Sequence, residues 1–113
     1  MSRREAKLLL NDILDSIEKI RIYVDGYNFE SFLADSKTCD AVIRNFEIIG
    51  EAANRLPDKI REQYPDINWF RIRGFRNRIV HDYMGIDYSI VWTIIENDLE
   101  VFVTGISKIL SEI

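Results

Sequence analysis

The segment from residue 69 to residue 83 holds the side chains best suited to chemistry in this chain. It gathers four arginines and the sole histidine of a protein whose formal net charge is −4, namely Arg71, Arg73, Arg76, Arg78 and His81. A guanidinium group can bind two phosphate oxygens at once, and imidazole exchanges protons near neutral pH. The segment therefore suits phosphate chemistry, in which His81 is the only imidazole that one chain can supply.

The spacing of residues 66–83, ahead of Gly85, predicts a single helix. At about 100° per residue the four arginines would surround this helix, so they cannot all face solvent. Some should pair with carboxylates of neighbouring helices, such as Glu47 or Glu51, or face a second chain. Arg71 and Arg73 suit structural ion pairs best, and for the two glutamates ion pairing is a better role than metal binding.

Angles within the predicted helix place the chemical groups relative to one another. Asn77 and His81, four residues apart, would be neighbours, so Asn77 is expected to steady His81. Arg76 and His81 would lie about 140° apart, too far to hold one phosphate. This favours a site made by two copies of the helix around a twofold axis. A place in the last helical turn would also favour protonated His81.

Here the residues resemble a known family. The pattern Arg76-Asn77-x-x-x-His81-x-Tyr83, preceded by Gly74, is similar to the signature of HepT-like proteins, which are minimal toxins of the HEPN superfamily. Residues 46–57 and 69–76 look like that family as well, so the resemblance covers nearly the whole chain.

This resemblance implies a homodimer whose two motifs face each other and cut RNA without a metal ion or other cofactor. Arg76 and His81 would be the catalytic pair, with Asn77 in support and Arg73 and Arg78 as candidate contacts to RNA phosphates. It also implies a type VII toxin–antitoxin system. In that system a nucleotidyltransferase partner, MntA, transfers AMP from ATP to the motif tyrosine, here Tyr83, and silences the toxin.

Other roles for the same residues stay open. A lone histidine near a helix C-terminus is often a cap or a solvent-facing residue, and Tyr83 could be a core aromatic with a polar tip. The alternative function is a non-catalytic helical dimer that binds and regulates, or is modified by, a partner nucleotidyltransferase.

The elements that must position these residues are expected to be helices throughout. With 5 Gly and 2 Pro among 113 residues, the chain lacks the frequent breaks of an all-β protein. We expect one domain, residues 1–113, forming an all-α, up-and-down bundle of four to five helices, HEPN-like and homodimeric. The predicted segments are 3–25 with a stop at Gly26, a short piece at 29–33, a long helix that starts at a cap in Asp35-Ser36 and ends before Pro57, two turns at 58–64, 66–83, and a last helix capped by Asp87.

Composition excludes several classes of protein. The acidic balance argues against coating nucleic acid over the whole surface, although a local basic site remains compatible with it. One cysteine, Cys39, cannot form an internal disulfide. No stretch approaches the ~20 apolar residues of a membrane span. We therefore expect a cytoplasmic protein without membrane contact.

Overall fold

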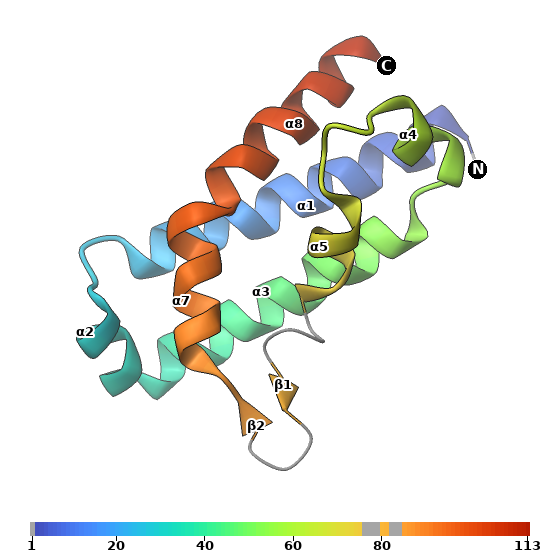
Figure 1. Cartoon of the computed structure of the whole chain (residues 1–113). Coiled ribbons are helices and arrows are strands. Elements are labelled where there is room, and N and C mark those ends of the chain that lie inside the picture. The colour runs from blue at the N-terminus through green and yellow to red at the C-terminus, as the bar shows by residue number, and fades with distance from the viewer. Residues whose placement is uncertain (1, 76–79, 82–84) are drawn as a thin grey trace.

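Helices make up most of the chain that the structure describes, which comprises residues 2–75, 80–81 and 85–113 of a computed structural model (Figure 1). In chain order the elements are α1 (Arg3–Val24), α2 (Phe29–Ala34), α3 (Ser36–Arg55), α4 (Asp58–Gln63), α5 (Trp69–Arg73), β1 (Val80–His81), β2 (Gly85–Ile86), α7 (Tyr88–Asn97) and α8 (Leu99–Glu112). The predicted all-α class is confirmed.

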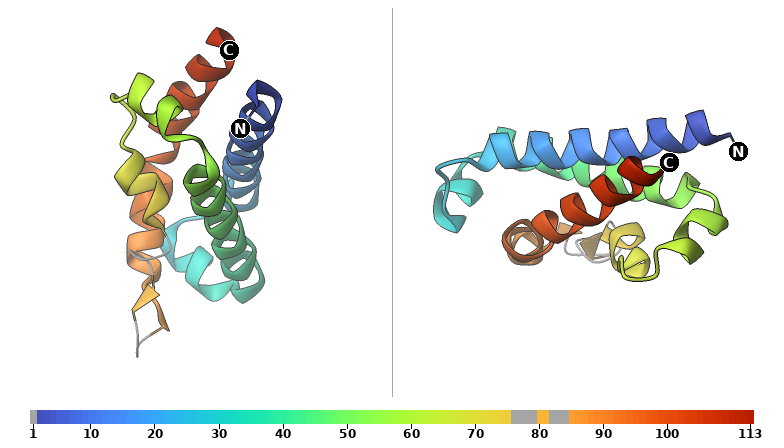
Figure 2. Two further views of the ribbon diagram at one scale, coloured as in Figure 1. Left: turned by 90° about the vertical axis from the view of Figure 1, so that its right-hand side faces the viewer. Right: turned by 90° about the horizontal axis from the view of Figure 1, so that it is seen from above.

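The helices lie in two layers (Figure 2). The antiparallel pair α1 and α3 forms one layer, while α5, α7 and α8 form the other. The shortest dimension, 21 Å, equals two layers of helices, each roughly 10 Å across. Both chain termini lie on the side of the molecule away from the β1–β2 pair (Figures 1 and 2).

The α1 helix follows the predicted apolar stripe closely. Leu10, Ile13, Ile17 and Ile20 are all fully buried against the rest of the molecule. Gly26, with φ of 79°, adopts the left-handed backbone that other residues rarely enter. The predicted helix and its stop are both confirmed.

The sequence predicted a cap in Asp35-Ser36, and Asp35 is the residue that caps the start of α3. Its carboxylate accepts hydrogen bonds from the Thr38 backbone N–H (3.1 Å) and hydroxyl (2.7 Å) and from the Tyr27 hydroxyl (2.6 Å). These bonds, that of Tyr27 first, lower the pKa of Asp35 from 3.8 to about 2. The same cap therefore ties the loop between α1 and α2 to the start of α3.

The predicted helix over residues 66–83 is wrong. Helix α5 ends at Arg73 with Gly74 as its C-cap, and the Gly74 N–H donates to the Phe70 carbonyl at 3.0 Å. Further along, Val80 pairs with Ile86 and His81 with Gly85 in an antiparallel ladder. Glycine weakens a helix interior and β-branched Val80 favours an extended backbone, so both local preferences oppose one continuous helix.

The last predicted helix is also divided. Asp87 caps it as expected, accepting from the N–H groups of Ser89 (3.1 Å) and Ile90 (3.3 Å). The chain then changes direction at Asp98, where α7 ends and α8 begins (Figure 1). The apolar spacing runs through this point without a break, so the sequence pattern alone did not reveal it.

The core joins the two layers. Among the described residues its largest fully buried side chains include three phenylalanines, Phe32, Phe46 and Phe75. Trp69 and Cys39 are buried as well, in line with the packing roles that their types favour. Within the described parts of the chain, no helix has the length and apolar character needed to cross a membrane.

Candidate functional site

A buried aromatic side chain fixes the point at which the motif begins. Phe75 is fully buried, and its ring lies 5.2 Å from that of Phe46 and 5.6 Å from that of Phe102, edge to face in both cases. Such ring pairs are favourable beyond the area they bury. Since Arg76 is the next residue, the motif starts directly from the core contact between α3 and α8.

The other end of the motif is held by backbone structure. His81 and Gly85 are paired in the β1–β2 ladder, and Gly85 has φ of 74°, a left-handed backbone that suits glycine. Asp87 follows at once and caps α7. The chain leaving the motif is therefore fixed within two residues of Gly85.

The predicted site residues fall largely between these two anchors. Arg76, Asn77, Arg78 and Tyr83 lie outside the described residues, and for His81 the structure describes the backbone in β1. The predicted catalytic pair, the supporting Asn77, the Tyr83 modification and the Arg78 contact therefore stay predictions. Arg73 is described, at the end of α5.

The strand at His81 changes two arguments made from the sequence. Helical angles cannot be carried to His81, because it lies in β1, so the angular case for a twofold site, and for Asn77 beside His81 one helical turn away, no longer holds. The helix dipole cannot favour protonated His81 either, because His81 lies in β1 and not in a last helical turn. A dimeric site must rest on the signature and on the single histidine.

Arg71 has a structural role, but with a partner that the sequence did not suggest. Its Nε lies 2.7 Å from the Oδ2 of Asp98, which is 9% exposed at the junction of α7 and α8. Within the described part of the chain, neither Glu47 nor Glu51 pairs with Arg71 or Arg73, and Glu47 lies 3.8 Å from Arg44 instead. The ion-pair role predicted for Arg71 is confirmed, whereas Glu47 and Glu51 are not the partners of Arg71 or Arg73, and the described residues give Arg73 no ion pair.

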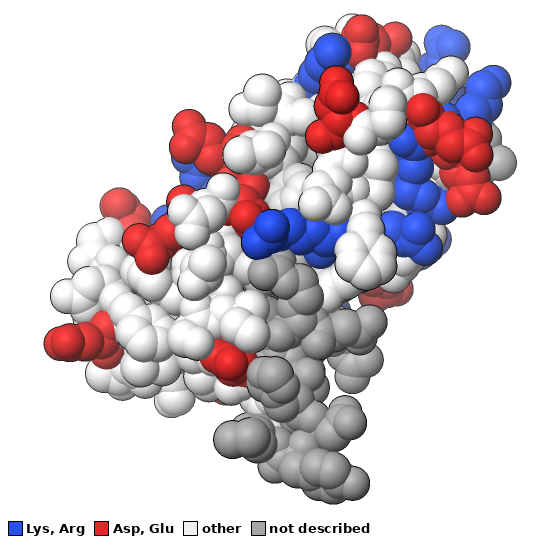
Figure 3. Space-filling view, in the orientation of Figure 1, with Lys and Arg blue, Asp and Glu red and all other residues white. Residues whose placement is uncertain are grey.

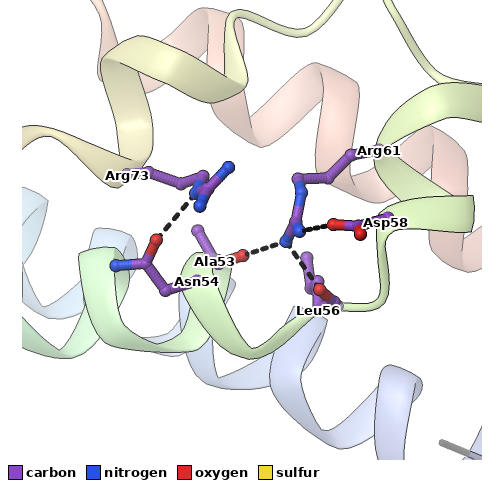
Figure 4. Close-up of polar contacts among 6 residues, drawn as sticks. All are labelled: Ala53, Asn54, Leu56, Asp58, Arg61 and Arg73. Carbon is purple, nitrogen blue, oxygen red and sulfur yellow. Dashed lines mark hydrogen bonds and ion pairs between the residues drawn. The ribbon is translucent and has the colours of Figure 1, made fainter.

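Arg73 reaches back from α5 to α3 (Figure 4). Its Nε donates to the Oδ1 of Asn54 at 2.7 Å, and both side chains are exposed. The carbonyl oxygen of Arg73 would lie 3.5 Å from a Cβ on Gly50, so the two helices approach closely here. Asn54 is a partner that the sequence offered no signal for, because the two residues are nineteen positions apart.

Arg61 on α4 is engaged differently from Arg73. Its Nη1 donates to the carbonyls of Ala53 (3.0 Å) and Leu56 (2.6 Å), and its Nη2 contacts the carboxylate of Asp58 (Figure 4). This guanidinium binds the backbone carbonyls at the end of α3, and its contacts are all within the fold. Arg61 is therefore unavailable for a ligand.

Positive side chains gather around α5 on one face of the molecule (Figure 3). Asp and Glu side chains are spread over the two ends of the same face. The protein is acidic overall, yet Lys and Arg side chains are concentrated around α5 on this face. The expectation of a local basic site in an acidic chain is consistent with it.

A cavity of about 830 Å³ lies between the loop after α4 and α8, and its lining includes Arg3 and Ile113 near the two chain ends. Its wall includes the Arg71–Asp98 pair, Tyr64 and Glu112. Burial, followed by the interaction with Glu112, raises the pKa of Tyr64, so its phenol stays protonated at neutral pH. Within residues 2–75, 80–81 and 85–113, no three His, Cys, Asp or Glu side chains are placed to hold a metal ion.

Comparison with known proteins places the chain in a family. Residues 13–109 match the profile of the family described as "Ribonuclease HepT-like". The chain is 34% identical over 113 residues, all of this chain and 93% of the relative, to "Putative RNase MJ0127" of Methanocaldococcus jannaschii. It is 37% identical over 97 residues, 86% of this chain and 88% of the relative, to "Probable ribonuclease HepT" of Thermococcus cleftensis.

A third relative, from Caldanaerobacter subterraneus, is named "Putative RNase TTE0752" and is 34% identical over 103 residues, 91% of this chain and 92% of the relative. No solved structure shows a significant match to the chain. The profile covers most of the sequence and the relatives are matched over nearly their whole lengths. The chain, an all-α HEPN-like bundle, belongs to the HepT-like ribonuclease family.

Proposed function

We propose that this protein is a metal-independent endoribonuclease and the toxin of a type VII toxin–antitoxin pair, with an active site made by Arg76 and His81 of two protomers. The observation that carries this proposal is the pattern Arg76-x4-His81-x-Tyr83 in a chain of the HepT-like ribonuclease family. The anchored flanks of the motif, Phe75 and Asp87, support it because a preorganised site needs fixed ends.

The chemistry follows from the two residue types. The ribose 2′-oxygen attacks phosphorus as the bond from phosphorus to the 5′-oxygen breaks, which yields a 2′,3′-cyclic phosphate and a 5′-hydroxyl. A histidine takes the proton of the 2′-hydroxyl, and a protonated histidine gives one to the departing 5′-oxygen. The Arg76 guanidinium stabilises the extra negative charge on the phosphate oxygens.

A dimer supplies the second imidazole. Each chain has one histidine, so separate acid and base residues require two chains. In the same proposal Asn77 orients His81, and Arg78 binds a phosphate near the cut.

Regulation would act on the same segment. A nucleotidyltransferase of the MntA kind would let the Tyr83 phenol oxygen attack the α-phosphorus of ATP and expel pyrophosphate. The attached AMP brings a negative phosphate two residues from His81, where it would compete with RNA for the arginine.

The first experiment measures RNA cleavage with EDTA present. Purified wild type should cut single-stranded RNA and leave cyclic phosphate ends, whereas His81→Ala and Arg76→Ala should each lose about 10²- to 10⁴-fold in rate. Arg55→Ala, an exposed arginine on α3, is the matched control and should cleave as wild type does. Undiminished cleavage by His81→Ala would reject the catalytic assignment.

The composite site has its own test. A heterodimer of one wild-type chain and one His81→Ala chain should be nearly as inactive as the double variant, because acid and base come from different chains. Half of the wild-type rate would show that each chain works alone. Light scattering that finds only monomers at micromolar concentration would also reject this arrangement.

Modification is tested by intact-mass analysis after incubation with a nucleotidyltransferase of the MntA kind and ATP. Tyr83→Phe should remain unlabelled while Tyr88→Phe, a tyrosine at the start of α7, is labelled like wild type. Tight partner binding and labelling without any RNA cleavage would favour the non-catalytic alternative over the nuclease.

A further inference from the structure

Helix α5 exposes an aromatic side chain directly before the motif. Phe70 is 91% exposed, more than any other large apolar side chain that the structure describes. Its neighbours Trp69 and Ile72 are 8% and 0% exposed, so the other face of the same short helix is fully packed. The exposure of Phe70 is therefore a property of a well-anchored helix, and burial elsewhere on the helix leaves the ring free.

A guanidinium lies on the same side of α5. Arg73 is three residues after Phe70, a spacing that puts two side chains on one helix face. The Nε of Arg73 donates a hydrogen bond to Asn54, while the two Nη groups of Arg73 form no ion pair with a carboxylate of the described residues. Helices α4 and α5 contain three arginines. Arg61 pairs with Asp58 and Arg71 with Asp98, whereas the charge of Arg73 is not balanced by a carboxylate of the described residues.

In the sequence these two residues come just before the motif. The Gly74 N–H bonds to the Phe70 carbonyl, so one helical turn connects Phe70 to Gly74. Buried Phe75 comes next and Arg76 follows it in the sequence. A nucleotide beside the scissile phosphate would therefore pass over the exposed face of α5.

We propose that Phe70 stacks on an unpaired RNA base and that Arg73, held by Asn54, binds a phosphate flanking the cleavage site. The inference rests on the proposed nuclease function and adds the substrate class, single-stranded RNA. Aromatic rings and arginines together are the usual means of holding single strands without reading their sequence, since every base has a stacking face. The positive side chains around α5 fit a polyanion (Figure 3).

A second protein chain fits this surface less well. An apolar partner covering Phe70 would also remove water from the neighbouring guanidinium of Arg73 without supplying a countercharge. RNA provides both the stacking surface and the anion. A copy of this chain on the same face is one outcome that the test below separates.

The test uses His81→Ala dimers, which should bind RNA without cutting it, and a fluorescein-labelled single-stranded oligoribonucleotide followed by anisotropy. Phe70→Ala should weaken binding about 5- to 150-fold, as expected for one lost stacking contact. Phe70→Trp should bind as well as Phe70, whereas Phe70→Leu should be nearly as weak as Phe70→Ala. Leu8→Ala, an apolar residue on α1 with 58% exposure, is the matched control.

Arg73 is tested through salt. Arg73→Gln should weaken binding and reduce the slope of log affinity against log salt by about 0.7, the value for one phosphate contact on a single strand. Asn54→Ala should weaken binding less and leave the slope nearly unchanged, because Asn54 positions Arg73 and does not touch RNA.

The outcomes separate the two proposals. If wild type does not cut RNA and His81→Ala dimers do not bind it, the nuclease function itself fails. If wild type cuts RNA, His81→Ala dimers bind it, and adding Phe70→Ala to those dimers leaves binding equally strong, only the stacking role is overturned. If Phe70→Ala dissociates the dimer while Phe70→Leu restores both dimer and binding, then Phe70 belongs to an interface between chains and the stacking role is also overturned.

Discussion

The α1–α3 layer and the segment from α5 to β2 are held in contrasting ways. The first consists of two long helices that pack through apolar stripes. Each buried side chain in a stripe has other buried side chains one turn away on the same helix. The second consists of short elements fixed at separate points, by Phe75, by the Arg71–Asp98 pair and by Gly85. The two ends of the motif are therefore positioned by a few single contacts, whereas the α1–α3 layer that supports them is held by many contacts of similar weight.

The largest effect should come from the buried ring before the motif. Phe75→Ala removes two edge-to-face contacts and leaves a cavity, so we expect a loss of about 3 to 5 kcal/mol in the free energy of unfolding. Ile17→Ala, on the fully buried stripe of α1, should cost about 2 to 5 kcal/mol. Urea denaturation followed by circular dichroism measures both.

Smaller substitutions in the two regions should differ in their effect on RNA cleavage. Phe75→Leu should lower RNA cleavage more than its stability loss explains, while Ile17→Val should leave cleavage by the folded protein unchanged. Equal activity of both variants at matched folded fractions would break the comparison.

The Arg71–Asp98 contact should show the next largest effect. Asp98→Asn leaves the guanidinium facing a neutral group, and we expect a loss of about 1 to 3 kcal/mol in unfolding free energy. Glu100→Gln, an exposed acid two residues later in α8, should change stability little. A result of equal, small losses for the two variants would mean that this contact does not anchor α5.

Two glycines with left-handed backbones allow a direct comparison. Gly26 has φ of 79° and follows α1, whereas Gly85 has φ of 74° and follows the motif, and a Cβ would meet no atom within 4 Å at either. Each Gly→Ala should therefore cost about 1 to 2 kcal/mol from the backbone alone. RNA cleavage should fall for Gly85→Ala only; equal activity of both would argue against a fixed exit from the motif.

The smallest effect concerns the cap of α3. The pKa of Asp35 is lowered to about 2, so its ionised form stabilises the fold above about pH 4, and this contribution is lost as pH falls towards 2. Asp35→Asn should flatten the stability curve over that pH range, and Asp12→Asn, an exposed acid on α1, should not. Parallel curves for wild type and Asp35→Asn would contradict the cap's role.

The α1–α3 layer could be predicted from the sequence more fully than the segment from α5 to β2. The limits of α1 and α3 could be predicted because each apolar stripe is bounded by a clear signal, Gly26 after α1, Asp35-Ser36 at the start of α3 and Pro57 after α3. Residues 66–83 could not, because apolar spacing extends through Gly74 while the pairing partner of Val80 lies beyond the expected helix stop. Ladder pairing is a tertiary choice that helical periodicity does not encode.

The site could be predicted in its residue types and less in its geometry. Arg71 was assigned an ion pair from its sequence, yet its partner Asp98 is brought near by the turn between α7 and α8. Asn54 reaches Arg73 across nineteen positions. Phe70 resembled any apolar residue of an amphipathic segment, and its exposure emerged only from the packing of Trp69 and Ile72.

The position of the two chain termini has a practical consequence. Both lie on the side away from the β1–β2 pair (Figure 1). An affinity tag, a fluorophore or a surface tether attached at either end would therefore stand clear of the β1–β2 pair, which holds His81. Immobilised protein should bind oligonucleotides as protein in solution does, which makes single-molecule measurements of this chain feasible.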